Sequence, residues 1–242
     1  MGYRADHMTS ALTEESPGVT LALTLAGRAM DAARASADVR AQVEEGLRDL
    51  ERLTTIPLDP DLAASARRIA ATGGAETLLG TGLSAAPYPA LLWNGERASR
   101  AGLGPSAVLT LVGLVIGRGD GAASARLVQG VTAGLAIRDT SEWPGKRAIA
   151  PTAAVTTDVI CAAACAAVTA GMELGDVAKV LDIAGSLMII KPASSVGSAE
   201  MSGLWSGHAL AAGWLAVQLH RADVSGMSGG LEHTLRIIAG SQ

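Results

Sequence analysis

Three ionisable side chains in the sequence stand where acid–base chemistry could take place. Asp158 lies in an Ala-rich segment, so its carboxylate should either face a pocket or pair with a base such as Arg138 or Lys146. His208 begins an expected helix, where a neutral imidazole could transfer protons; a capping or surface position is the alternative. Glu200 is either a base poised by partial burial or an exposed carboxylate.

The two cysteines, Cys161 and Cys165, lie four positions apart and therefore on one face of the same expected helix. No second Cys or His group is placed to complete a metal site with them. We interpret them as small buried apolar residues, with no disulfide, as is typical of a reducing cytoplasm. The glycine-rich segment 117–121 lacks the Lys-Ser/Thr pair of a phosphate-binding loop, and no nucleophile has an evident triad. We therefore expect no metal and no organic cofactor.

The elements that must position these groups are almost all helices. Apolar residues recur at three- and four-residue steps, and Gly and Pro clusters separate the runs. About ten helices with one short extended piece predict an all-α fold, with a flexible tail over 1–16 and a single helical domain over 17–242. The expected helices cover 19–53, 61–71, a stretch from about residue 90, 106–117, 122–139, 152–169, 176–185, 207–221 and 231–238. The extended piece is expected over 75–81, and residues 82–89, 141–151 and 187–206 are expected to be irregular.

The composition favours tight helix packing and excludes several classes of partner. Hydrophobic residues make up 49% of the chain, yet it has no Phe, 2 Tyr and 4 Trp. Small side chains let helices approach closely. The net charge is −4 and no basic stripe is present, so a nucleic-acid partner is not expected. The longest apolar stretches, 107–116 and 209–219, fall short of the ~20 residues of a membrane-spanning helix. We expect a soluble cytoplasmic protein.

Six short segments, in order along the chain, give it a resemblance to a known family. They resemble motifs of the MmgE/PrpD family, which includes dehydratases, decarboxylases and an epimerase. The segments are Gly73–Gly82 (GGAETLLGTG), Leu92–Gly95 (LWNG), Pro105–Leu109 (PSAVL), Ala150–Ala153 (APTA), Ile183–Ser186 (IAGS) and Gly203–Gly213 (GLWSGHALAAG). They cover the family's larger helical domain, and its smaller α+β lid domain has no counterpart among these residues.

The departures from the family pattern fall on its functional positions. The family has His where this chain has Gly104 and Ala150, and it has Lys and His where this chain has Ser202 and Trp205. The family's acidic stretch after the second motif is also missing. Proton abstraction beside a carboxylate needs a base, and carboxylate substrates need cations. We therefore do not expect the family's reactions on methylcitrate or aconitate.

What remains of the family site predicts a more apolar pocket. Trp205 in place of His suggests a larger apolar ligand, although a plain packing role is the alternative. Lys191 is a candidate for a relocated cation, or else a solvent-facing loop lysine. Asn94 matches the family's Asn and either lines the pocket or orients the turn. The candidate catalytic residues are thus Glu200, Lys191, His208 and Asp158, and the candidate substrate-binding residues are Trp205, Ser202, Asn94, Thr152 and Trp93.

Taken together, the sequence supports two functional hypotheses. The first is a cofactor-independent lyase, isomerase or cyclase that acts on a small, largely apolar, polyketide-like intermediate of bacterial secondary metabolism. The second is a catalytically inert binding or scaffold subunit that partners another enzyme. Because family members are generally dimers and an absent lid would uncover apolar surface, we also expect a homodimer. A deep cavity near Trp205, Thr152 and Asn94 would favour the enzyme, and a filled core the scaffold.

Overall fold

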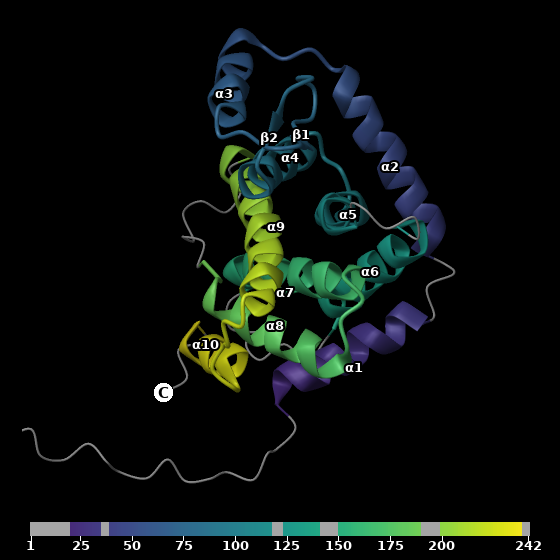
Figure 1. Cartoon of the computed structure of the whole chain (residues 1–242), viewed down its shortest axis with the longest axis vertical. Coiled ribbons are helices and arrows are strands. Elements are labelled where there is room, and N and C mark those ends of the chain that lie inside the picture. The colour runs from purple at the N-terminus through teal and green to yellow at the C-terminus, as the bar shows by residue number, and fades with distance from the viewer. Residues whose placement is uncertain (1–19, 35–38, 118–122, 141–149, 190–198, 239–242) are drawn as a thin grey trace, which may run out of the picture.

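The prediction of an all-α fold is confirmed by the structure, a computed structural model that describes residues 20–34, 39–117, 123–140, 150–189 and 199–238. Within these ranges the chain forms ten helices and one two-stranded ribbon (Figure 1). The helices are α1 (Leu21–Arg34), α2 (Arg40–Thr55), α3 (Pro60–Ala70), α4 (Pro87–Arg100), α5 (Pro105–Ile116), α6 (Ala123–Arg138), α7 (Ala150–Thr169), α8 (Leu174–Ser186), α9 (Ala199–Arg221) and α10 (Gly230–Ile238). The expected tail over 1–16 lies outside the described residues.

Helix α7 lies at the centre of the helix packing. It contacts α1, α5, α6, α8 and α9, and α9 crosses it in the middle of the molecule (Figure 1). Every residue from Val159 to Val168 is buried, as the Ala-rich sequence predicts. Because this stretch has no polar face, neighbouring helices can enclose it on all sides. The candidate carboxylate Asp158 stands at the edge of the buried run.

Glycines at the helix crossings confirm the expected close packing. A Cβ built on Gly213 of α9 would lie 2.6 Å from the carbonyl carbon of Ala162 in α7. A Cβ on Gly46 of α2 would lie 2.9 Å from the Cα of Ala107 in α5. Real Cβ atoms essentially never come so close, so these crossings require the absence of a side chain.

The start of α9 corrects one expectation. The sequence predicts irregular structure up to residue 206, whereas α9 begins at Ala199. Gly and Ser lower the helix propensity of this stretch, but here they serve as contact residues. A Cβ on Gly203 would lie 3.1 Å from the backbone oxygen of Glu96, and one on Gly207 would overlap the backbone oxygen of Leu92. Packing against α4 therefore overrides the local propensity.

A short antiparallel ribbon precedes α4. Strand β1 (Glu76–Thr77) pairs with β2 (Ser84–Ala85), with Glu76 opposite Ala85. The expected extended piece is thus confirmed at β1, while β2 falls in a stretch expected to be a loop. Gly74 enters the ribbon with φ at +133°, and a Cβ there would overlap the backbone of Ala85, so only glycine fits.

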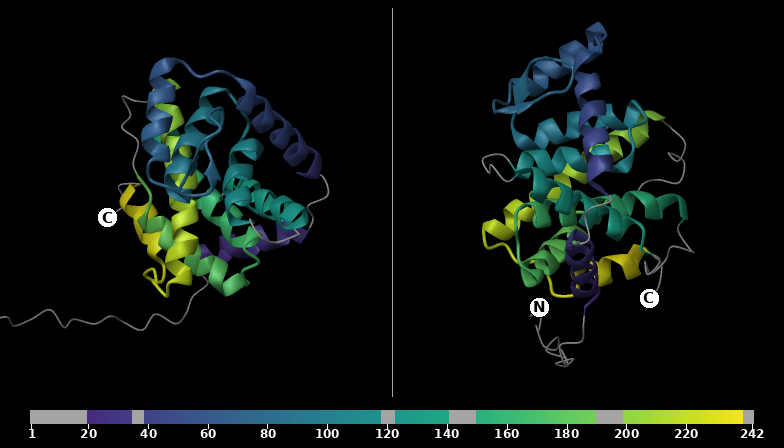
Figure 2. Two further views of the ribbon diagram at one scale, coloured as in Figure 1. Left: turned by 45° about the horizontal axis from the view of Figure 1, so that its top comes forward. Right: turned by 90° about the vertical axis from the view of Figure 1, so that its right-hand side faces the viewer.

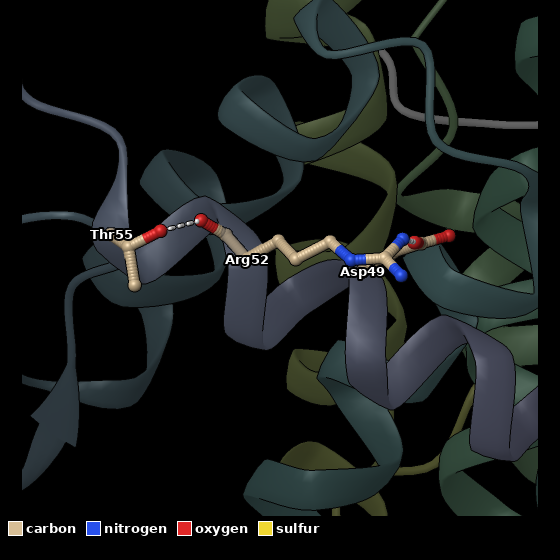
Figure 3. Close-up of polar contacts among 3 residues, drawn as sticks. All are labelled: Asp49, Arg52 and Thr55. Atoms are coloured by element: carbon tan, nitrogen blue, oxygen red, sulfur yellow. Dashed lines mark hydrogen bonds and ion pairs between the residues drawn. The ribbon is translucent and has the colours of Figure 1, made fainter.

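Helix α2 lies on the outside of the molecule and contacts α5 (Figure 2). Its apolar face buries Val43 and Leu50. On its polar face, Arg52 Nη1 lies 2.8 Å from Asp49 Oδ1, and the Thr55 hydroxyl donates to the backbone oxygen of Arg52 at 2.8 Å (Figure 3). The Thr55 bond satisfies one of the carbonyls that a helix end leaves without a partner. The apolar face of α2 packs against α5 and, to a smaller extent, α6.

None of the helices in the described ranges combines the length and the apolar composition needed to cross a membrane.

Candidate active site

A cavity of about 250 Å³ lies where α4, α5, α6, α7 and α9 converge. Among the described residues that line it, the polar groups are one carboxyl, one guanidinium, one thiol and two hydroxyls, and the other described lining residues are apolar. The described lining residues are Ser99, Leu103, Pro105, Val108, Leu109, Arg138, Asp158, Cys161, Ser206, Ala209 and Leu210. A few convergent polar groups in an apolar hollow are typical of small-molecule sites.

Asp158 is the group in this cavity with the strongest capacity for proton transfer. Burial raises the pKa of its carboxyl to about 6, and the positive charge of Arg138 partly opposes that rise. Burial has this effect because a low-dielectric surrounding disfavours the charged form of an acid. Near neutral pH both protonation states are accessible, which is the property that a general acid–base needs.

Arg138 supplies the positive charge of the site. It is the last residue of α6, it is exposed, and it lines the cavity together with Asp158. Their charges attract each other, but in the described part of the chain no direct ion pair joins them. The guanidinium therefore keeps donors available for an oxygen of a bound molecule.

Two serines bring hydroxyls to the same cavity from helices far apart in sequence. The hydroxyl of Ser206 in α9 donates to that of Ser99 in α4 at 3.3 Å. The close crossing of α4 and α9 makes this approach possible, since a Cβ on Gly95 would lie 2.7 Å from the Cα of Gly207. Hydroxyls can both donate and accept, so this pair can bind either a carbonyl or an alcohol.

The size of the cavity bounds what it can hold. A volume of 250 Å³ corresponds to about eight water molecules at roughly 30 Å³ each. Cys161 also lines the cavity, and burial raises the pKa of its thiol well above the usual range, so the thiol is protonated and weakly nucleophilic. The arrangement therefore favours acid–base chemistry on a small molecule over covalent attack by sulfur.

Of the candidate catalytic residues, the structure brings Asp158 into the cavity and places His208 elsewhere. The His208 Nε2 atom lies 3.4 Å from the backbone oxygen of Leu187, at the end of α8. Trp205 is partly buried, its indole N–H has no partner among the described residues, and it is not among the described residues that line the cavity. The structure thus does not gather His208 and Trp205 with Asp158.

Trp93 and Asn94 are buried and hold the segment after β1. The Asn94 side-chain oxygen accepts the Leu79 N–H at 2.8 Å, and its amide donates to the Thr77 oxygen at 2.9 Å. The Trp93 indole donates to the Leu79 oxygen at 3.2 Å. This geometry matches the alternative in which Asn94 orients the turn. We therefore assign both side chains a structural role and leave them out of the site.

The other candidates fall where the structure gives no side-chain description. Lys191 lies outside the described residues. Thr152 belongs to α7, and Glu200 and Ser202 belong to α9, but only their helical backbone is described. Their expected roles remain predictions.

Sequence reasoning missed Ser99, Cys161 and Ser206 as site residues and saw Arg138 only as a partner for Asp158. A usable signal was present in the helical spacing. Ser206 lies three and four positions before the apolar pair Ala209–Leu210, and Cys161 lies three after Asp158. For Ser206, the signal was hidden because the start of α9 was placed too late.

Comparison with known proteins leaves the family open. No protein-family model matches the chain, and no curated protein matches it at a significant level. The resemblance to the MmgE/PrpD helical domain therefore stays a prediction. Among the described residues, no group of three or more His, Cys, Asp or Glu side chains is placed to hold a metal ion.

Proposed function

We propose that this protein is a cofactor-independent lyase or isomerase that acts on a small, largely apolar carbonyl compound. The observation that carries the proposal is the partly buried Asp158 carboxyl, whose pKa is raised to about 6, in a cavity that it shares with Arg138. A carboxylate that can accept a proton and a cation that can stabilise the developing oxyanion both favour proton abstraction next to a carbonyl.

The lyase step is written as dehydration of a β-hydroxy ketone. The Asp158 carboxylate takes the proton from the carbon between the carbonyl and the hydroxyl-bearing carbon, and the electron pair moves toward the carbonyl oxygen beside Arg138. The new double bond then forms as the C–O bond breaks. The leaving hydroxyl takes the proton from Asp158 and departs as water, so the carboxylate is regenerated and no other reactant is needed. An isomerase would share the first proton transfer.

The open cavity also bears on the scaffold alternative. A scaffold subunit has no need for a hollow that brings a carboxyl and a guanidinium together. A carboxyl with restricted access to water also lowers the stability of the folded state, a cost that a scaffold subunit has no reason to bear. Both features support the enzyme over the inert subunit, and the experiment below separates the two.

The test uses a β-hydroxy methyl ketone with a methyl tail. Loss of water gives a conjugated enone, whose formation is followed by NMR. The purified full chain should form enone, and Asp158→Asn should lower the rate by about 100-fold or more, the range expected for loss of a general base. Arg138→Gln should also lower the rate, because the developing oxyanion loses its cation.

The matched control is Asp223→Asn, which removes one carboxylate from an exposed position outside the cavity. Asp223 has φ at 58°, a conformation that Asn also tolerates, so the fold should be retained. Enone formation at the same rate by wild type and Asp158→Asn would contradict the proposal. Tight binding of the ketone without any turnover would instead favour a binding subunit.

A further inference from the structure

A groove of about 440 Å³ adjoins the cavity and takes no part in the chemistry proposed above. It lies between the start of α2, the start of α5 and the end of α6. Its described lining residues are Val39, Gln42, Pro105, Ser106, Thr132, Leu135, Ala136, Arg138 and Asp139.

The groove and the cavity share two wall residues. Pro105, which begins α5, and Arg138, which ends α6, line both spaces. Arg138 is exposed and carries a long, flexible side chain, so it can shift without disturbing the packed helices. A molecule that extends past Arg138 would pass directly from the cavity into the groove.

The cavity alone is small for a substrate site. Its 250 Å³ is below the 300–1,000 Å³ that is typical of ligand pockets, whereas the cavity and the groove together fall within that range. We infer that the groove is a second subsite, which binds the tail of the substrate whose reacting carbonyl end occupies the cavity. This inference rests on the proposed function and adds the substrate class: an elongated β-hydroxy carbonyl compound with a neutral, mainly aliphatic tail.

The groove chemistry selects a neutral tail. Val39, Leu135 and Ala136 provide apolar surface. Arg138 and Asp139 place opposite charges side by side at one end, so a tail of either charge would meet repulsion as well as attraction. The Thr132 hydroxyl donates to the backbone oxygen of Val128 at 2.7 Å, so its proton is not offered to a ligand.

The experiment measures binding with two probes that differ only in tail length. Both are β-hydroxy methyl ketones, one with a methyl tail and one with a hexyl tail, and dissociation constants are obtained by calorimetry on the full chain. Each buried methylene strengthens binding, so the hexyl probe should bind at least about tenfold more tightly than the methyl probe, even when burial is incomplete.

Two substitutions fill the groove without touching the cavity. Gln42→Trp acts from the exposed face of α2, where folding is little affected, and Ala136→Phe acts from α6. Each should abolish the advantage of the hexyl probe and leave binding of the methyl probe unchanged. Ala41→Trp and Gln129→Phe are the matched controls, because they place the same side chains at exposed positions of the same helices outside the groove. Both controls should bind like wild type.

The outcomes separate this inference from the proposed function. A hexyl probe that gains no affinity, or that gains it equally in the groove-filled variants, overturns the second subsite. If the methyl probe does not react, or reacts equally in Asp158→Asn, the proposed chemistry is overturned. Even then, an affinity that depends on tail length and on the groove substitutions would demonstrate the subsite.

Discussion

Replacement of Asp158 by Asn should change how the stability of this protein depends on pH. In the folded chain burial raises the pKa of this carboxyl from 3.8 to about 6. The folded state therefore holds a proton that the unfolded state releases between these two values, so the contribution of Asp158 to stability is present at low pH and is lost as pH rises through about 6. Asparagine is neutral at every pH and has no such dependence.

The linkage relation gives the size of the effect. For pKa values of 3.8 and about 6, wild type should lose about 2 kcal/mol relative to Asp158→Asn between about pH 4.5 and about pH 7.5. This is an upper figure because Asp158 keeps some contact with solvent through the cavity. The attraction to Arg138 acts only on the ionised carboxylate, and it is already contained in the pKa of about 6.

Urea unfolding of the two proteins at both pH values measures this difference. The free energy of unfolding of Asp158→Asn minus that of wild type should be larger at the higher pH than at the lower pH by about 2 kcal/mol. All other titrating groups are common to both proteins and cancel. Asp223→Asn controls for the loss of one carboxylate. A difference that stays constant between the two pH values would refute the burial argument for Asp158.

Four further predictions concern packing, hydrogen bonding, thiol reactivity and assembly. Gly207→Ala should lose about 1–3 kcal/mol of stability in urea unfolding because its Cβ meets the backbone of α4, whereas Gly27→Ala, which meets nothing within 4 Å, should gain up to about 1 kcal/mol. Asn94→Asp should lose about 1–3 kcal/mol, because a carboxylate cannot donate to the carbonyl that the amide now serves; an unchanged midpoint would argue against the structural role. Cys161 and Cys165 should both react with a disulfide reagent far more slowly than a free thiol, since burial raises the pKa of both, that of Cys165 to about 12. Light scattering should give the mass of a dimer, and a monomer would contradict the expected assembly.

The fold was predictable because its signals are local. Repeats of apolar residues at helical spacing, interrupted by Gly and Pro, place most of the helices, although the single helix expected over 19–53 corresponds to two helices, α1 and α2. The start of α9 was not predictable in this way. Gly203 and Gly207 weaken a helix in isolation, and only the neighbouring α4 explains why glycine is required there. Contacts between segments far apart in the chain are invisible to a local pattern.

The site was predictable only in part, for the same reason. Asp158 stands out in sequence because a carboxylate in an Ala-rich helix needs a partner or a pocket. His208 and Trp205 stood out through their chemistry and their place in a motif. In the fold, however, the face of α9 that lines the cavity carries Ser206 and Leu210, and His208 lies beside Leu187. Arg138 was expected as a possible partner of Asp158, whereas Ser99 comes from another helix that only the assembled fold brings to the cavity.

The central claim is that Asp158 exchanges a proton with carbon next to a carbonyl, and solvent exchange tests it most directly. The methyl-tailed β-hydroxy ketone is incubated with protein in deuterated buffer, and deuterium at that carbon is followed by NMR. We predict that wild type accelerates incorporation, with a rate that rises through about pH 6, where the pKa of Asp158 lies, and that Asp158→Asn does not accelerate it. Incorporation at the buffer rate with wild type, or equal acceleration by the variant, would contradict the claim.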